Sequence, residues 1–171
     1  FTDEFELSKL GEATQFEHFC NFAICSKLFR GSFDLSDVHT GSGNDCGIDG
    51  ILLLVNGRII TDVDQVNDIA DCSSYLDVDI CFIQAKTSAS FSSSEMWTFI
   101  NGVKSFLDEE STNLKNKEVQ KMKSIWEMLI NDKAHLMINR NPTCKLYYAT
   151  TGKWTGDANL QFVSSSVKLL P

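Results

Sequence analysis

The sequence predicts an α/β domain in which a mixed central sheet is flanked by helices. Two apolar runs of strand length, over residues 49–55 and 78–86, and helical spacing of apolar residues over 14–29 and 92–107 support this prediction. With 171 residues, 43% of them hydrophobic, the chain suits one domain with its own core. We therefore expect a single domain over residues 1–171. Because the chain lacks a starting Met, we expect an N-terminal fragment of a longer protein.

The first half of the chain predicts one helix and a hairpin. Apolar residues recur at helical spacing over 14–29 (Phe16, Phe19, Cys20, Ala23, Ile24 and Leu28). A Gly-rich loop then leads into the nearly unbroken apolar run of 49–55, which is typical of a buried strand. Asn56-Gly57 is the preferred two-residue hairpin turn, so residues 58–61 are expected to return as a partner strand. The acidic stretch of 62–77 is interpreted as a loop with one short helix.

The second half predicts a strand, two helices and a last strand. After the strand over 78–86, Ser92 and Glu95 have the spacing of a capping box, which opens a helix that ends near residue 107. A further helix is expected over about 115–131, and a strand over 146–150 that ends before Gly152. The inward faces of the two helices are expected to be Met96, Phe99, Ile100, Val103 and Phe106, and Val119, Met122, Trp126 and Leu129.

Charge is distributed unevenly along the chain. The net charge of −8 argues against nucleic-acid binding, because phosphate contacts normally need a basic face. However, residues 61–79 carry six aspartates and no Lys or Arg. Many of the basic residues lie between 104 and 145 (Lys115, Lys117, Lys121, Lys123, Lys133 and Arg140). This asymmetry is compatible with one DNA-facing side and equally with a solvated helix.

The six cysteines form no Cys-x-x-Cys pair, which disfavours a zinc site. Reduced, buried thiols in a cytoplasmic protein are favoured over a disulfide framework. No apolar run approaches the roughly 20 residues that cross a bilayer, and the N-terminus does not resemble a signal peptide. We therefore expect no membrane partner. The three histidines, His18, His39 and His135, share no metal-ligand spacing.

Three polar residues stand at the ends of the two strongest strands. Asp49 opens the strand over 49–55, while Gln84 and Lys86 close the strand over 78–86. Gln84 and Lys86 share one face of their strand because side chains alternate along a strand. If the two strands pair, a carboxylate, an amide oxygen and an ammonium converge. Hard oxygen ligands suit a divalent cation, and a phosphate under attack needs nearby positive charge.

Each of these residues also has a structural interpretation. Asp49 beside Gly50 could be a turn residue, but a carboxylate buried among apolar residues favours a binding role. Gln84 and Lys86 could lie on an exposed edge, although their apolar neighbours favour a central strand. For Asp45 the turn role is favoured. For Glu17 a capping role and a role in the site are evenly balanced. Thr14-x-x-Glu17 is a valid capping box, but Glu17 also borders the apolar stripe of its helix, from where it could reach the site.

These motifs resemble the PD-(D/E)xK nuclease superfamily in its Mrr-like Gln-x-Lys variant. They most resemble the N-terminal region of abortive infection phage resistance (AIPR) proteins. The similarity rests on Asp-Cys-Gly-Ile-Asp-Gly at 45–50 and Phe-Ile-Gln-Ala-Lys-Thr-Ser at 82–88, followed by Phe91 and Glu95. It extends from about residue 12 to 152. The resemblance implies a restriction-endonuclease-like fold and a bacterial anti-phage function.

The resemblance also implies the chemistry. Asp49, Gln84 and the backbone carbonyl of Ala85 would bind Mg²⁺ or Mn²⁺, and Lys86 would steady the attacking water or the charge on the phosphate. Glu17 would assist as a helix carboxylate. The implied partners are nucleic acid, DNA above all, further C-terminal domains of the same protein and a second copy in a homodimer.

Two other functions remain open. A catalytically inactive module that keeps the nuclease fold would explain the acidic surface and the Gln in the position of the usual Glu. A small-molecule hydrolase is disfavoured, because the sequence has no nucleophile elbow and no histidine-based dyad. No phosphate-binding loop is present either, since Gly41-Ser-Gly lacks the Lys and the helix of a P-loop.

Overall fold

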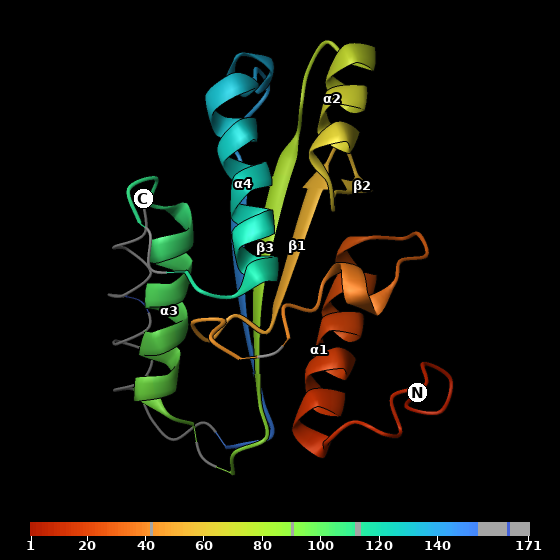
Figure 1. Ribbon diagram of the computed structural model, residues 1–171, viewed down its shortest axis with the longest axis vertical. Coiled ribbons are helices and arrows are strands. Elements are labelled where there is room, and N and C mark those ends of the chain that lie inside the picture. The colour runs from red at the N-terminus through yellow and green to blue at the C-terminus, as the bar shows by residue number, and fades with distance from the viewer. Residues whose placement is uncertain (42, 90, 112–113, 154–163, 165–171) are drawn as a thin grey trace.

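A computed structural model describes residues 1–41, 43–89, 91–111, 114–153 and 164. Within these residues the chain forms a mixed α/β domain with four helices and a four-stranded sheet (Figure 1). The helices are α1 (Glu12–Leu28), α2 (Val63–Cys72), α3 (Ser93–Leu107) and α4 (Lys117–Asp132). The strands are β1 (Gly50–Val55), β2 (Arg58–Ile59), β3 (Val78–Lys86) and β4 (Thr143–Thr150).

The sheet has the order β2-β1-β3-β4. β1 pairs antiparallel with β2 and with β3, whereas β4 runs parallel to β3. Phe82 of β3 lies opposite Ile51 on one side and Leu146 on the other. The α/β class and the mixed sheet expected from the sequence are therefore confirmed, and β3 is a central strand.

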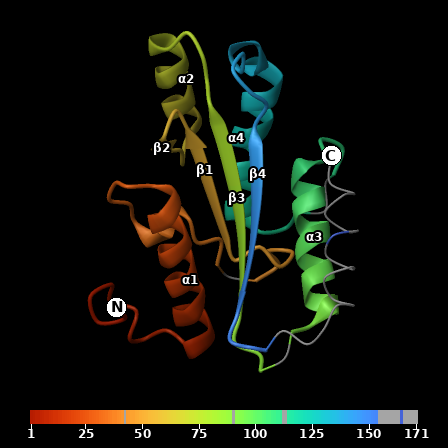
Figure 2. The ribbon, with the colours of Figure 1, turned by 180° about the vertical axis from the view of Figure 1, so that it is seen from behind.

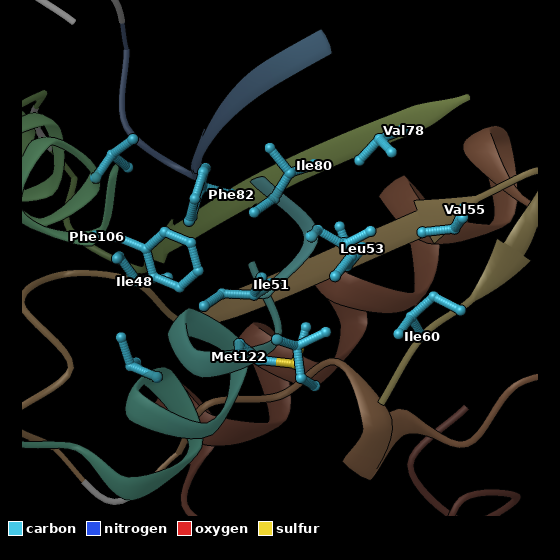
Figure 3. Close-up of a cluster of buried hydrophobic side chains, with 14 of the residues drawn as sticks. Ile48, Ile51, Leu53, Val55, Ile60, Val78, Ile80, Phe82, Phe106 and Met122 are labelled. Atoms are coloured by element: carbon cyan, nitrogen blue, oxygen red, sulfur yellow. The ribbon is translucent and has the colours of Figure 1, made fainter. Parts of the chain in front are cut away.

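Helices cover both faces of the sheet. α1 packs on one face, while α2, α3 and α4 pack on the other (Figures 1 and 2). Alternate residues of β1 serve the two cores, as the period of a strand requires. Ile51, Leu53 and Val55 belong to the larger core with α2, α3 and α4 (Figure 3), and Leu52 and Leu54 face α1.

α1 begins earlier than the sequence suggested. Its N-cap is Gly11, which makes no side-chain cap, and Glu12 is the first helical residue. The Gln15 amide nitrogen donates to the carbonyls of Leu7 and Leu10, at 3.2 and 2.8 Å, and so ties the preceding segment to the first turn. The predicted capping box of Thr14 and Glu17 is therefore wrong. Glu17 lies in the second turn of α1, where it caps nothing.

Three other expectations need adjustment. The acidic stretch after the hairpin contains a ten-residue helix, α2, which opens on a capping box of Asp62 and Gln65. β4 begins at Thr143, three residues before the expected start, because the parallel pairing with β3 extends to Asp79. All six cysteines are free, but Cys72 and Cys144 are exposed and Cys46 is half-buried, so the expectation of buried thiols holds for the other three alone.

The remaining elements agree with expectation in type and order, although β2 ends at Ile59, short of the strand expected over 58–61. Asn56 and Gly57 both have positive φ, at 49° and 73°, as a hairpin turn of the primed type requires. The Ser92 side chain accepts from the backbone N–H of Glu95 at the start of α3. No helix in the described part of the chain has the length and apolar character that a bilayer crossing requires.

Candidate functional site

The backbone of Asp49 is held from three sides, directly before β1. Its N–H donates to the carbonyl of Ile83 in β3 at 2.8 Å. Its own carbonyl accepts from the Asn21 amide nitrogen of α1 at 3.0 Å and from the Thr40 N–H at 3.3 Å. Strand, helix and loop thus fix the position from which the Asp49 side chain projects.

The Asp49 carboxylate meets the end of β3. Its Oδ2 accepts from the backbone N–H of Ala85 at 2.8 Å and lies 3.7 Å from the Lys86 ammonium. The residue is only 5% exposed. Burial raises its pKa to about 6, against the opposing effects of the Ala85 hydrogen bond and of Lys86. Asp49 and Lys86 therefore come together on one side of the sheet, with a carboxylate that burial makes costly to ionise.

Gln84 lies beneath the loop that precedes Asp49. The antiparallel register, with Gly50 opposite Ile83, sets Asp49 opposite Gln84. Gln84 is 1% exposed, and its Oε1 is buried without a hydrogen-bond partner among the described residues. A buried amide oxygen that lacks a donor is costly, so it marks a place where an electropositive group would be stabilised.

Gly47 lets the loop cover Gln84. It has a φ of +75°, and a Cβ there would lie 2.9 Å from the Gln84 Nε2 and 3.2 Å from the backbone nitrogen of Phe99. Asp45 supports the same turn, because its Oδ1 accepts from the Gly47 N–H at 2.8 Å. The turn role expected for Asp45 is confirmed.

The backbone carbonyl of Ala85 faces the same edge of β3 as Asp49. In an antiparallel ladder, the N–H and the C=O of one residue point to the same neighbouring strand. The Ala85 N–H binds the Asp49 carboxylate, so its carbonyl is directed to that side too. In agreement, the next carbonyl along, that of Lys86, accepts from Thr151 after β4.

Glu17 reaches this region from α1. It lies one turn before Asn21, on the same face of the helix, and Asn21 binds the backbone of Asp49. The negative charge of Glu17 is one of the causes that raise the pKa of Asp49, after burial. Gly50 permits this approach, because a Cβ there would overlap the Asn21 amide.

Two residues near Asp49 were not anticipated from the sequence. His39 pairs with Gly50 through an isolated antiparallel bridge, and its Nε2 lies 3.1 Å from the Glu17 carboxylate. Asn21 could have been found as a polar residue on the apolar face of a helix. His39 had no such local signal, because its bridge to Gly50 closes a loop that the sequence does not specify.

A tyrosine and a glutamate border the site. Tyr148 of β4 lies opposite Gln84 in the parallel register, and its hydroxyl is 3.5 Å from the carboxylate of Glu95 in α3. Burial, followed by the charge of Glu95, raises the pKa of Tyr148 to about 12. The tyrosine therefore keeps its proton at neutral pH.

Of the basic residues in the second half of the chain, some are engaged within the fold and others are exposed. Lys123 is buried and donates to carbonyls at the end of α3, and Arg140 pairs with Asp79 at 2.9 Å, so both are engaged within the fold. Lys115 and Lys117, by contrast, are exposed. They line a polar pocket of about 310 Å³ beside the loop that leads to Asp49.

Comparison with known protein families, with curated proteins and with solved structures found no match to this chain. Within the described ranges, no three or more His, Cys, Asp or Glu side chains gather as a metal-binding group. A cation site here would therefore depend on a single carboxylate with amide and backbone oxygens.

Proposed function

We propose that this chain is a nuclease domain that hydrolyses phosphodiester bonds of DNA with the help of Mg²⁺ or Mn²⁺. One observation carries the proposal. The Asp49 carboxylate, 3.7 Å from the Lys86 ammonium, lies where β1 begins and β3 ends. The buried amide oxygen of Gln84, which has no hydrogen-bond partner among the described residues, lies at the same end of these strands. This combination of acid, neutral oxygen and cation suits a phosphate and a divalent ion better than it suits a structural ion pair.

The residues present fit a hard divalent cation. Asp49 would supply one charged oxygen, Gln84 its orphaned Oε1, and Ala85 its backbone carbonyl. When bound, such an ion polarises a phosphoryl oxygen and lowers the pKa of water. It would also remove the cost of the buried Asp49 charge and of the unpaired Gln84 oxygen.

The protein groups around the ion would orient the water molecule and neutralise charge on the phosphate. Lys86 is about one-quarter exposed, at 28%, so its ammonium can reach both Asp49 and a phosphate in solvent. There it would stabilise negative charge that grows in the transition state. Asp49, held by Asn21, Thr40 and Ile83, would keep a fixed direction. Glu17, on the side of α1, would orient a water molecule at the edge of the site.

The wider proposal follows the motif resemblance. A restriction-endonuclease-like fold, of the Mrr-like Gln-x-Lys kind, is compatible with a mixed sheet whose two faces are covered by helices. An AIPR-like role in abortive infection would place this domain ahead of C-terminal domains, and a homodimer would let two sites cut two strands. These further features belong to the proposal.

A second candidate is a module with a nuclease fold that binds without cutting. The close cover of Gln84 by Gly47 and Phe99 favours it, because a ligand oxygen at 1% exposure is reached only if the loop moves. The net charge of −8 also fits a domain whose partner is not nucleic acid.

Cleavage assays separate the two candidates. We expect the complete protein to cut plasmid DNA with Mn²⁺ and to lose this activity with EDTA. Lys86→Ala should reduce the cleavage rate at least about a hundredfold while DNA affinity changes little, because Lys86 acts mainly on the transition state. Asp68→Asn, on the exposed side of α2, serves as the control and should cut like wild type.

The same assays can contradict the proposal. Binding of DNA without metal-dependent cleavage would favour the non-catalytic module. Cleavage of RNA in place of plasmid would keep the mechanism and change the substrate. Equal losses of affinity and rate in Lys86→Ala would make Lys86 a simple phosphate contact.

A further inference from the structure

His39 joins two parts of the molecule that meet at Asp49. Its backbone pairs with Gly50, the residue directly after Asp49. Its imidazole Nε2 lies 3.1 Å from the Glu17 Oε2, within hydrogen-bond distance. His39 thus connects the start of β1 to the carboxylate of α1 by one backbone pairing and one side-chain contact.

The surroundings of His39 limit how its ring can turn. The ring of His18 packs against it, with centroids 4.0 Å apart and planes tilted by 35°. Gly41 also approaches the ring closely and leaves room only for hydrogen, because a Cβ there would lie 2.8 Å from the imidazole Cε1. The His39 side chain is only 13% exposed. Close contacts with His18 and Gly41 therefore restrict the ring whose Nε2 faces Glu17.

Glu17 itself has few restraints from its own helix. It lies in the second turn of α1, caps no N–H group, and is 22% exposed. A glutamate carboxylate on three rotatable bonds loses considerable conformational freedom when it is fixed. Its neighbour one turn on, Asn21, is held by the Asp49 carbonyl. Of the contacts described for the Glu17 side chain, the His39 hydrogen bond is the one that fixes the carboxylate.

We propose that His39 is a positioning residue that holds the Glu17 carboxylate at the edge of the Asp49 site. The inference rests on the proposed nuclease function, in which Glu17 orients a water molecule. His39 acts through Glu17 and touches neither substrate nor ion. Such second-sphere hydrogen bonds fix the direction of a functional carboxylate, and a small displacement there reduces the rate strongly.

The test compares four variants in the full-length chain. Glu17→Gln removes the carboxylate, His39→Leu removes the donor, and the double variant removes both. His39→Gln places an amide nitrogen near the position of Nε2 and so keeps the donor. His135→Leu is the matched control, because His135 is an exposed histidine outside the site.

Single-turnover cleavage of DNA with saturating Mn²⁺ gives the main readout. We expect Glu17→Gln and His39→Leu each to slow cleavage by about 10- to 100-fold, and the double variant to be no slower than the worse single variant. His39→Gln should stay within about threefold of wild type, and so should His135→Leu. The Mn²⁺ affinity, measured by calorimetry, should change less than about twofold in all of them, because neither residue is a ligand.

A second readout needs neither metal nor cleavage. Urea unfolding of wild type, Glu17→Leu, His39→Leu and their double variant at pH 8 in EDTA gives a double-mutant cycle for the contact itself, because Leu at position 17 leaves no acceptor. Each substitution lowers the folding equilibrium constant by some factor. If the two side chains interact, the factor for the double variant should be at least about threefold smaller than the product of the two single factors.

Each outcome is decisive. Multiplicative losses of rate in the double variant, or a His39→Gln variant as slow as His39→Leu, would overturn the positioning role while the nuclease proposal stood. A large drop of Mn²⁺ affinity in His39→Leu would also overturn it. A wild-type protein that never cleaves would remove the nuclease proposal and this inference together, even if the unfolding cycle showed coupling.

Discussion

At the scale of single residues, the buried position of Asp49 disfavours the charged carboxylate that cation binding would require. It is 5% exposed, and among the described residues one N–H group and one ammonium compensate its charge. Burial outweighs both and raises its pKa to about 6, from an ordinary 3.8. Below about pH 6 the metal-free protein therefore favours a protonated Asp49, whereas a cation requires the charged form.

This conflict predicts an unusual dependence of stability on pH. Because the folded-state pKa lies above the unfolded one, Asp49 contributes stability below pH 4 that is lost as the pH rises through 6. In EDTA, the unfolding free energy of wild type minus that of Asp49→Asn should fall by about 2.4 kcal/mol between pH 4 and pH 8. Urea titrations of both proteins measure the difference. A difference that stays flat with pH would mean that solvent reaches the carboxylate.

Gln84→Glu tests the neighbouring position. A carboxylate adds Coulomb attraction that an amide oxygen lacks, so the variant should bind Mn²⁺ at least about tenfold more tightly. In EDTA its melting temperature should fall, because two buried carboxylates would face each other. Calorimetric titration and melting curves with and without Mn²⁺ check both effects. Unchanged Mn²⁺ affinity would exclude Gln84 as a ligand and strengthen the non-catalytic alternative.

At the scale of elements, the loop before β1 is docked on α3. Gly102, a buried residue of α3, lies directly against the backbone carbonyl of Cys46, where a Cβ would overlap that oxygen. One side of the loop therefore rests on the helix, while Gly47 rests on Gln84. The docking of α3 determines how closely the loop covers Gln84.

Gly102→Ala should reverse the usual effect of this substitution. In a helix interior, Gly→Ala normally stabilises by about 0.5–1 kcal/mol. Here the methyl group would push the loop from α3, and we expect a loss of about 1–3 kcal/mol. Lys104→Ala, at an exposed position of the same helix, should stay within about 0.5 kcal/mol of wild type. Urea unfolding of the two variants gives the comparison, and a stabilised Gly102→Ala would disprove the close docking.

The sequence predicted those features of the fold that have a local cause. The apolar runs around Leu53 and Phe82 and the hairpin turn at Asn56 each depend on neighbouring residues, and the structure agrees with them. The start of α1 was missed, because Gly11 is the N-cap and Gln15 binds the carbonyls of Leu7 and Leu10 in the segment before the helix, which the capping pattern at Thr14 does not reveal.

The residues of the candidate site also divide into those with a local cause, which the sequence predicted, and those without one. The side chains of Gln84 and Lys86 follow from strand alternation, and Asp49 from the pairing of two buried strands. His39 could not be found in this way. Its partners, Glu17 and Gly50, are distant in the sequence, and only the folded loop brings them together.

At the scale of the whole molecule, the acidic helix α2 and the exposed lysines at the start of α4 lie in different regions. α2, with its acidic flanks, packs against the half of the sheet remote from Asp49 (Figure 1). The exposed Lys115 and Lys117 at the start of α4 line the polar pocket next to the loop that precedes Asp49. A phosphate backbone would therefore approach on the side of Lys115 and Lys117, in spite of the net charge of −8.

The salt dependence of DNA binding tests this orientation. If Lys115 and Lys117 each contact a phosphate, replacing both with Ala should reduce the slope of log affinity against log salt by about 1.8. The control Lys27→Ala/Arg30→Ala removes two exposed charges near the end of α1 and should leave the slope unchanged. Fluorescence anisotropy with a short duplex between 50 and 200 mM NaCl gives both slopes. Equal reductions in the two variants would mean that DNA attraction is unspecific.

The parallel pairing of β3 with β4 has a consequence for the order in which the chain folds. β1, β2 and β3 are joined by a tight turn and one short helix, whereas the chain must complete α3 and α4 before β4 can return beside β3 (Figure 2). Closing this longer loop costs more entropy, and such pairings form late. During synthesis, Asp49, Gln84 and Lys86 would thus meet while the β4 side of β3 is still bare. An emerging chain would expose an apolar strand edge until Thr150 had been added, and that interval is when a chaperone or a second chain could bind it.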